Sequence, residues 1–493
     1  MESPADSPQI DSKSFADQVR SAVIWRSGSQ ILAQIVQWGA TFLVIRLLAP
    51  SDYGLFAMTQ VILFLLNMLN GYGLASGLIQ AKEVSERQIR QLFGMLILVN
   101  LTLAGLQVAL APLAAAYYRQ PLVAEMLRWQ ALIYLATPLT ALSYALLSRQ
   151  MEYRRQARVN IIASIASAST ALGGALFGLG VWTLVVAPMV LFAVRMIGMT
   201  VAARAYYWPS FDFRGAGTLA RYGGVMAVGQ LFWFFESQAD VFIAGRQFNP
   251  HWLGIYTESL FLAQVFVSKI VPPLNEVAFS AYARLQHDEG AVGRAFARGV
   301  RIVMVAALPF YIGLAATAEP LVLTMLGPKW VEGVPVVRLL ALAMPFMTLH
   351  VLLSPACDAI GRPGISVRNG ATGAVLLTGA YLVGVQWGPM GLAWAWLAVY
   401  PLYLGISLWR SLPVIGVRAD ALASAILPPL LAAMGMGIAV ALLARLLPPL
   451  PPPVTLLILV AAGGAVYFGW LALFARSVIG ELSDTIRRRP ATA

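Results

Sequence analysis

The stretch RLLAPSDYGLF, residues 46–56, recurs in outline 200 residues later as RQFNPHWLGIY, residues 246–256. Arginine, proline, glycine and an aromatic residue hold the same positions in both copies, and each copy lies between two long apolar segments. The pattern predicts a sharp corner, in which the proline stops one helix and the glycine lets the next helix pack closely. A repeat of this length predicts a membrane protein whose two halves enclose a binding site.

The composition is that of a membrane protein. The chain has 493 residues, of which 59% are hydrophobic and only 11% are charged. Apolar runs of about 20 residues, each sufficient to cross roughly 30 Å of hydrocarbon, recur along the whole chain. The mixed charges of residues 1–22 and the lack of a cleavage pattern argue against a signal peptide. With a single cysteine, Cys357, disulfides are excluded and a cysteine-rich metal site is not expected.

The sequence predicts an all-α, polytopic integral membrane protein with about fourteen transmembrane helices. The predicted spans are residues 23–48, 55–80, 92–112, 128–148, 159–178, 181–203, 222–246, 253–282, 299–318, 337–359, 368–387, 390–409, 422–445 and 454–475.

The net charge of +12 is distributed as a topology signal rather than as a nucleic-acid patch. Most of the 34 Lys and Arg residues fall on alternate connections, which the positive-inside rule places in the cytoplasm together with both termini. Two short glycine-rich links, residues 178–180 and 387–391, hold matching places before the sixth and twelfth spans. We therefore expect two six-helix lobes around a central cavity, plus an extra helix pair. The expected domains are a cytoplasmic N-terminal tail (1–22), an N-lobe (23–210), a C-lobe (211–415), the extra hairpin (416–475) and a cytoplasmic C-terminal tail (476–493).

Further motifs make the resemblance to a known family specific. They are residues 46–56 with 77–80, residues 147–154, residues 272–280 with 285–288, residues 326–330 and residues 361–363. Together they resemble Wzx-type polysaccharide flippases of the colanic-acid or xanthan kind, in the superfamily that also holds multidrug exporters and the lipid II flippase.

This resemblance implies a cargo and a location. The cargo would be an undecaprenyl-diphosphate-linked oligosaccharide repeat unit, carried from the cytoplasmic to the periplasmic leaflet of a bacterial inner membrane for exopolysaccharide or lipopolysaccharide synthesis. The carrier would work by alternating access, as an antiporter driven by Na⁺ or H⁺, with a polysaccharide polymerase and export machinery as its expected protein partners.

Polar residues of the first span form a stripe. Arg26, Gln30, Gln34 and Gln37 fall within one arc of a helix. Lipid would leave them unsatisfied, so they must face protein or water. Either they line the cavity and contact sugar and phosphate, or they hold neighbouring helices together.

The seventh span carries two acids one turn apart, Glu236 and Asp240, with Trp233 on a similar face. Acids at this depth are costly unless they are paired, protonated or bound to an ion. They are candidates for cation or proton coupling, or for structural pairing with Arg195 or Lys269. Trp233 is a candidate for stacking on a sugar ring or for packing.

Lys269 precedes Pro272 and Pro273, which should break the eighth span and free backbone groups beside a binding site. It is a candidate phosphate ligand, or a partner of Glu258 or Glu276. Arg195 in the sixth span is a candidate cavity cation, or it reaches the cytoplasmic surface. His350, which shares the tenth span with Ser354 and Asp358, is a proton-relay candidate or a hydrogen-bonded core histidine.

No catalytic constellation, phosphate-cradling glycine loop or metal-spaced His/Cys cluster occurs in the sequence. We therefore expect no enzyme activity, no cofactor and no nucleic-acid partner. Two alternatives remain: an ion-coupled drug exporter of the same superfamily, and a membrane polysaccharide polymerase or glycosyltransferase. The short outward connections argue against the latter, and the extra hairpin argues against the former.

Overall fold

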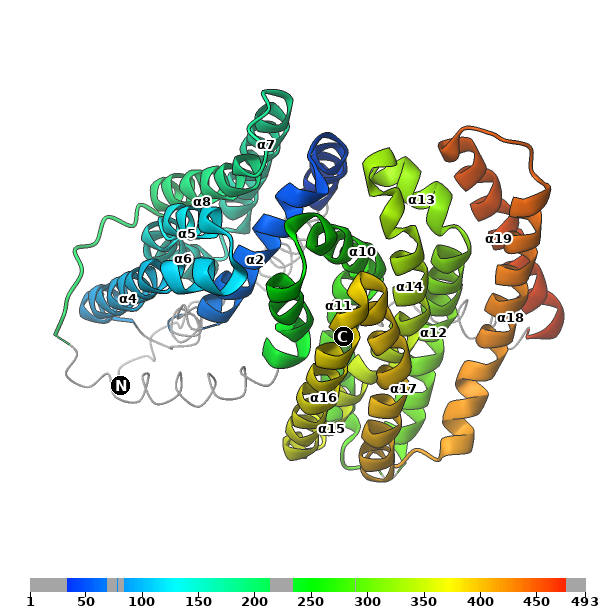
Figure 1. The fold of residues 1–493 in the computed structure, drawn as a ribbon. Coiled ribbons are helices and arrows are strands. Elements are labelled where there is room, and N and C mark those ends of the chain that lie inside the picture. Colours follow the sequence, from blue (N-terminus) through cyan, green and yellow to red (C-terminus); the bar gives the residue numbers. More distant parts are fainter. Residues whose placement is uncertain (1–32, 69–77, 79–83, 213–233, 289, 476–493) are drawn as a thin grey trace, which may run out of the picture. The chain divides into compact units, whose positions relative to one another are not determined.

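The computed structural model describes residues 33–68, 78, 84–212, 234–288 and 290–475, and these form helices joined by turns, with no strand among them. The helices are α2 (Pro50–Asn67), α4 (Glu86–Tyr118), α5 (Pro121–Gln130), α6 (Ile133–Arg149), α7 (Tyr153–Leu176), α8 (Trp182–Ala203), α10 (Pro250–Lys269), α11 (Val271–Leu285), α12 (Ala291–Ala316), α13 (Ala318–Met325), α14 (Val334–Val351), α15 (Leu353–Ala359), α16 (Pro363–Gly384), α17 (Gly388–Ile415), α18 (Ala419–Leu446) and α19 (Pro452–Phe474), with the 3-10 turns η1 (Pro328–Gly333) and η2 (Val385–Trp387) (Figure 1). Residues 33–47 and 234–247 are also helical.

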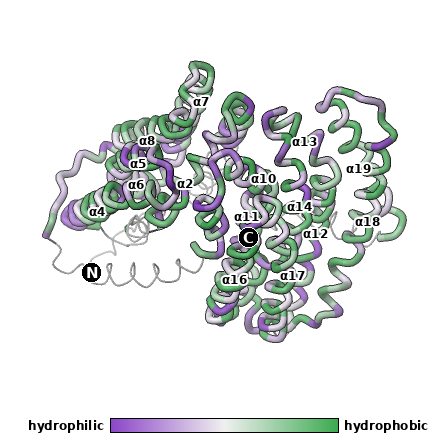
Figure 2. The backbone as a smooth tube through the Cα atoms, in the orientation of Figure 1, coloured by the Kyte–Doolittle hydropathy of each residue, from purple (hydrophilic) through white to green (hydrophobic). Residues whose placement is uncertain are grey.

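The predicted fold class is confirmed. Every predicted span overlaps one helix or two consecutive helices of the described residues. Ten helical stretches in this part of the chain are long and apolar enough to cross a membrane. Hydrophobic residues predominate along helices such as α18 and α19 (Figure 2). Helices suit a lipid environment, because each helix satisfies its own backbone hydrogen bonds.

The chain divides into two compact units. Unit 1 comprises residues 1–48 and 58–230, and unit 2 comprises residues 49–57 and 231–493. The first turns of α2 therefore belong with unit 2. The expected lobe and hairpin boundaries stay a prediction.

Unit 1 is built around α4 and α6. Leu92 and Leu96 of α4 share a buried cluster with Leu142 of α6. The segment that follows α8 is fastened along the start of α4, where the Ser210 amide donates to the Arg90 carbonyl (2.8 Å). The fourth, fifth and sixth predicted spans thus pack into one helical body with the third.

In unit 2, α12 contacts both α14 and α18. Helix α17 packs against α14 on one hand and against α16 on the other. The extra hairpin of α18 and α19 is anchored in this unit, since the Tyr467 hydroxyl of α19 donates to the Val305 carbonyl of α12 (2.8 Å). A proline-rich link joins α18 to α19, and Pro452 begins α19.

The two repeated corners pack against each other inside unit 2. A Cβ atom placed on Gly54 would lie 1.8 Å from the Pro250 carbonyl oxygen, and one placed on Gly254 would lie 1.8 Å from the Pro50 carbonyl oxygen. The contact is reciprocal, as expected where two copies of one motif meet about a local two-fold axis. The glycines do allow close packing, as the sequence predicted.

The expected role of the prolines was wrong in one respect. Pro50 and Pro250 do not stop the preceding helices, which end three residues earlier, at residues 47 and 247. They are instead the first residues of α2 and α10. Proline suits a first helical position because its fixed φ is already helical and the amide it lacks would have no intrahelical partner. Asn249 caps α10 by accepting from the Trp252 amide (2.9 Å).

The corner contact gives the first prediction. Gly54→Ala and Gly254→Ala should each lower the free energy of unfolding by about 1–3 kcal/mol, because the new methyl group meets a backbone oxygen that must move. The double variant should cost less than the sum of the two, since one separation of the corners relieves both clashes. Thermal unfolding of the purified protein measures this. Gly435→Ala on α18 is the control, because nothing lies within 4 Å of a Cβ there. Equal unfolding temperatures for all four proteins would contradict the contact.

Candidate functional site

A cluster of acidic and aromatic side chains lies within unit 2. The acids, Glu236 and Asp240, come from the helix of residues 234–247 and lie one turn apart. Their partners come from α10, α14, α16 and α17, which are far away in the sequence. The packing of these helices therefore assembles the site.

Asp240 is sealed inside the unit, with 1% of its surface exposed. The Tyr256 hydroxyl donates to Asp240 Oδ2 over 2.6 Å, and the Val241 amide donates to Oδ1 over 2.8 Å. Trp396 Nε1 in turn donates to the Tyr256 hydroxyl (3.0 Å), which fixes the direction of the tyrosine proton towards the acid. The carboxylate is thus held by a chain of donors that begins on α17.

Glu236 is half-buried and is held by a second tyrosine. The Tyr403 hydroxyl donates to Glu236 Oε1 over 3.1 Å. Gly370 of α16 faces the other carboxylate oxygen, since a Cβ there would lie 3.9 Å from Oε2. The His350 ring lies 4.3 Å from the Tyr403 ring, centroid to centroid, so an imidazole packs against the tyrosine that holds the acid.

The aromatic rings form one continuous group around the two acids. Trp396 and Tyr400 stack, with ring centroids 5.3 Å apart and an interplanar angle of 6°. Tyr381 lies 5.8 Å from Trp396 and Tyr400 lies 5.5 Å from Tyr403. These rings exclude water from Asp240, which strengthens each polar contact inside the group.

The acids receive neutral donors rather than basic partners. Among the described residues of unit 2, no basic side chain lies within ion-pair distance of Glu236 or Asp240. The alternative that Lys269 pairs with them is therefore wrong. A carboxylate with only hydroxyl and amide donors inside a membrane-spanning unit needs a proton or a bound cation to be neutral. The described residues hold no group of three or more His, Cys, Asp or Glu side chains suited to a metal ion.

Lys269 is the last residue of α10 and is exposed. The expected break follows at once, because α10 ends there and α11 begins at Val271. Neither Glu258 nor Glu276 lies within ion-pair distance of the Lys269 ammonium group, so that alternative is wrong as well. Asn275 fastens α11 by donating to the Val351 carbonyl (3.1 Å).

The remaining predicted site residues lie in other places. Gln34 and Gln37 are half-buried on the helix of residues 33–47, whose Ile35 is exposed, and Arg195 is half-buried on α8 of unit 1. Arg26, Gln30 and Trp233 lie outside the described residues.

His350 has neither of its expected roles in full. Among the described residues its buried Nε2 atom has no hydrogen-bond partner, so this nitrogen lacks the hydrogen bond expected of a core histidine. It does not form a relay with Ser354 and Asp358 either. Asp358 accepts instead from Ser354 (3.0 Å) and Ser366 (2.7 Å).

The sequence analysis missed the aromatic partners of the acids. Trp396, Tyr400 and Tyr403 recur at positions i, i+4 and i+7 of α17, which places them on one helical face. This spacing was visible in the sequence. What it faces was not, because Tyr403 and Glu236 are 167 residues apart.

Comparison with known proteins identifies relatives across most of the chain. Residues 43–335 match the family described as polysaccharide biosynthesis protein. The succinoglycan biosynthesis transport protein ExoT of Rhizobium meliloti is 26% identical over 399 residues, which cover 80% of this chain and 78% of that protein. The teichuronic acid biosynthesis protein TuaB of Bacillus subtilis is 23% identical over 433 residues, which cover 86% of this chain and 89% of that protein.

Solved structures share the fold. A structure of the lipid II flippase MurJ in an inward closed conformation superposes with a TM-score of 0.73 at 13% identity and covers 92% of this chain and 100% of its own. An inward-facing multidrug resistance transporter of the MATE family gives a TM-score of 0.58 at 13% identity, over 80% of this chain and 99% of its own. At these identities the likeness concerns the fold alone.

The hydrogen bond to Asp240 gives the second prediction. Tyr256→Phe removes the donor from a buried carboxylate and should lower the free energy of unfolding by about 1–3 kcal/mol. Tyr381→Phe is the matched control, because Tyr381 is equally buried in the same aromatic group, and its hydroxyl has no hydrogen-bond partner among the described residues. Thermal unfolding compares the two. If Tyr381→Phe destabilised the protein as much as Tyr256→Phe, the Asp240 hydrogen bond would not be the cause.

Proposed function

The chain belongs to the polysaccharide biosynthesis protein family, and on this premise we propose that it is a flippase for a polyprenyl-diphosphate-linked oligosaccharide. The cargo moves from the cytoplasmic to the outer leaflet of the bacterial cytoplasmic membrane, where exopolysaccharide or lipopolysaccharide is assembled. The family match over residues 43–335 is the observation that carries this proposal. The names of the relatives connect ExoT with transport in succinoglycan biosynthesis and TuaB with teichuronic acid biosynthesis.

The cargo needs a cation for its diphosphate. Lys269 supplies one, because its ammonium group is exposed at the α10–α11 break and has no acidic partner among the described residues. A lysine binds phosphate as a compact point charge with three donors. Arg26 is proposed as a second phosphate ligand, with Gln30, Gln34 and Gln37 as amides for the sugar hydroxyls.

Glu236 and Asp240 are proposed as the coupling site. One full turn of helix separates them, and two tyrosine hydroxyls already point their protons at the carboxylate oxygens. Binding of a proton or Na⁺ removes the cost of a buried negative charge, and its release restores that cost. Occupancy of the acids therefore changes the free energy of unit 2, and an ion gradient can bias the two states of an alternating-access carrier.

The two alternatives have less support. A drug exporter shares only the fold, because the multidrug transporter superposes at 13% identity. The drug-exporter alternative also has no support from ExoT and TuaB, whose names refer to biosynthesis. A membrane polymerase or glycosyltransferase would need a sizeable catalytic segment, whereas the α7–α8 and α18–α19 connections, which are predicted to lie on the outward side, are only a few residues long.

The third prediction concerns the cargo in cells. Deletion of the gene should leave a completed oligosaccharide on its polyprenyl diphosphate facing the cytoplasm, as determined by mass spectrometry of extracted lipids and by leaflet-specific labelling. Wild-type protein should restore export, and Lys269→Ala should restore it at least tenfold less well, a loss of about 1.4 kcal/mol of cargo binding. Arg284→Gln is the control, because it removes one exposed positive charge from the adjoining α11.

Three results would count against the proposal. Accumulation on the outer leaflet would indicate a polymerase. No accumulation, together with new sensitivity to toxic cations, would indicate a drug exporter. Equal export with Lys269→Ala and Arg284→Gln would remove Lys269 from the cargo site.

A further inference from the structure

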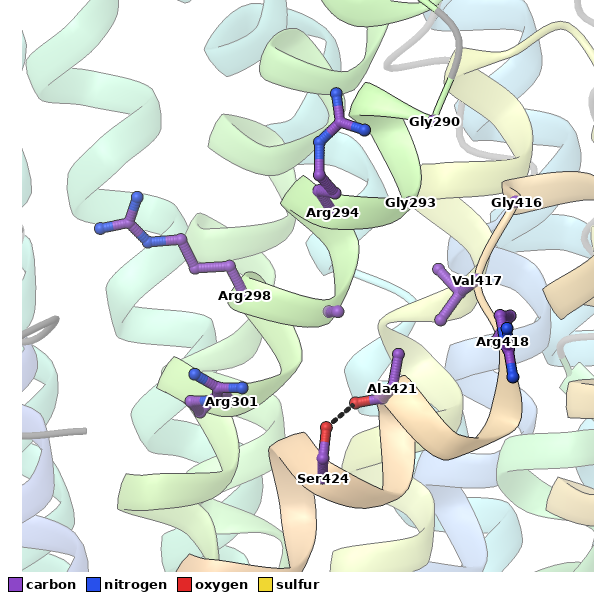
Figure 3. A pocket seen from close by; sticks show the side chains of 11 residues that line it. Gly290, Gly293, Arg294, Arg298, Arg301, Gly416, Val417, Arg418, Ala421 and Ser424 are labelled. Carbon is purple, nitrogen blue, oxygen red and sulfur yellow. Dashed lines mark hydrogen bonds between the residues drawn. The ribbon is translucent and has the colours of Figure 1, made fainter. Parts of the chain in front are cut away.

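A basic pocket lies where the first turns of α12 and α18 meet (Figure 3), and its lining shares no residue with the acidic and aromatic cluster. Its volume is about 680 Å³, within the range of about 300–1,000 Å³ typical of ligand pockets. The lining includes Gly290, Arg294, Arg298 and Arg301 from α12 and its cap, and Arg418 and Ser424 from the start of α18. Four arginines from two helices thus border one hollow.

The α12 arginines share a helical face. Arg294, Arg298 and Arg301 recur at positions i, i+4 and i+7, and Figure 3 shows them one above another along the helix. The guanidinium group of Arg294 has no hydrogen-bond or ion-pair partner among the described residues. It lies beside Gly290, the N-cap residue of α12. Its charge is therefore available to a ligand.

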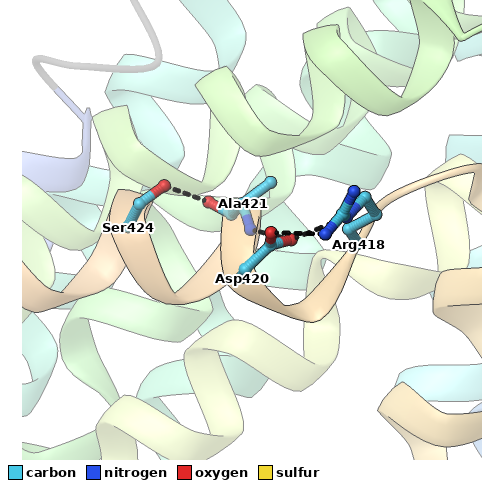
Figure 4. Close-up of polar contacts among 4 residues, drawn as sticks. All are labelled: Arg418, Asp420, Ala421 and Ser424. Carbon is cyan, nitrogen blue, oxygen red and sulfur yellow. Dashed lines mark hydrogen bonds and ion pairs between the residues drawn. The ribbon is translucent and has the colours of Figure 1, made fainter.

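At the start of α18 one of these arginines already pairs with a carboxylate of the protein. The Asp420 carboxylate accepts from Arg418 Nε (3.1 Å) and from the Ala421 amide (2.9 Å), while Ser424 donates to the Ala421 carbonyl (2.8 Å) (Figure 4). Both partners of this ion pair are largely exposed, so it is weak and can exchange with another anion. The described lining of the pocket includes four arginines and no acidic side chain, so the lining carries positive charge.

An exposed apolar stripe continues from the pocket along the same face of α18. Ala421 and Ser424 in the pocket are followed, at intervals of three and four residues, by the exposed side chains of Leu427, Leu431, Met434, Ile438 and Leu442. The positive-inside rule explains basic residues at helix ends. It does not explain why they surround a hollow from which an exposed apolar stripe continues along α18.

We propose that this pocket binds the phosphate headgroup of an anionic phospholipid, with an acyl chain lying along the α18 stripe. A basic pocket between transmembrane helices at the cytoplasmic side is a recurrent form of such a site. The placement at the cytoplasmic side follows from the positive-inside expectation for the α11–α12 and α17–α18 connections. The lipid fastens the extra hairpin to α12, and this role is independent of the cargo and of the coupling ion.

The test is a lipid titration of the full-length protein in neutral detergent, with bound molecules counted by native mass spectrometry. The probes are dioleoyl phosphatidylglycerol, dioleoyl phosphatidylcholine and inorganic pyrophosphate. We expect one phosphatidylglycerol to bind more tightly than the others. Arg294→Gln with Arg418→Gln should weaken that lipid by roughly thirtyfold, at about 1 kcal/mol for each basic residue.

Two control variants test whether lipid binding depends on this pocket, rather than on the net charge of the protein or on any exposed apolar residue. Arg362→Gln with Arg368→Gln removes the same charge from exposed positions around the start of α16, and should leave the tight lipid in place. Leu431→Asn should weaken phosphatidylglycerol, whereas Leu457→Asn, at an exposed position of α19, should not.

Three outcomes would overturn the proposal. They are equal loss of the lipid in both double variants, no loss in the Arg294 and Arg418 variant, and tight pyrophosphate binding that equals lipid binding. The last result would assign the pocket to a soluble phosphate. If the double variant does not fold, Arg294→Gln alone and Leu431→Asn give the same decision.

Discussion

A carboxylate placed inside a membrane-spanning body must be given donors, a proton or a cation, and this requirement governs unit 2. Asp240 meets it through Tyr256, whose hydroxyl is itself held by Trp396. Glu236 meets it through Tyr403. These bonds fix how the helix of residues 234–247 sits against α10 and α17. Both acids have neutral donors and no basic partner among the described residues of unit 2. In that setting, binding of a proton or Na⁺ lowers the cost of the negative charge most.

The contact between the two repeated corners is a second constraint on unit 2. At Gly54 and Gly254 two backbones approach without intervening side chains, and each glycine meets the other corner's proline carbonyl. Tyr53 of the first corner also packs edge-on against Trp330, with ring centroids 5.6 Å apart. A tight joint of this kind has few intermediate arrangements, so under the proposed coupling a change in charge at the acids would be transmitted as a discrete shift rather than absorbed locally.

Much of the fold could be predicted from the sequence, because hydropathy and length specify where helices cross a bilayer. The sequence also predicted the repeat, the break after Lys269 and the turn before α17, since proline and glycine constrain the backbone locally. Glu236 and Asp240 stood out because acids are rare in apolar runs. Their partners did not, because hydropathy says nothing of which helices become neighbours. The same limit applied to the arginines at the starts of α12 and α18. From the sequence they were interpreted as topology signals, and only the structure shows that they line one pocket.

The most direct test of the account is whether an ion gradient drives translocation through the buried acids. Purified protein would be placed in vesicles with a lipid-linked oligosaccharide, and its transfer between leaflets followed under a Na⁺ or pH gradient. The comparison is between Asp240→Asn, whose amide oxygen still accepts from Tyr256, and Asp358→Asn, an acid of the same unit that is held by two serines. The account predicts that the gradient accelerates the wild type and Asp358→Asn but not Asp240→Asn. An undiminished response in Asp240→Asn would contradict it.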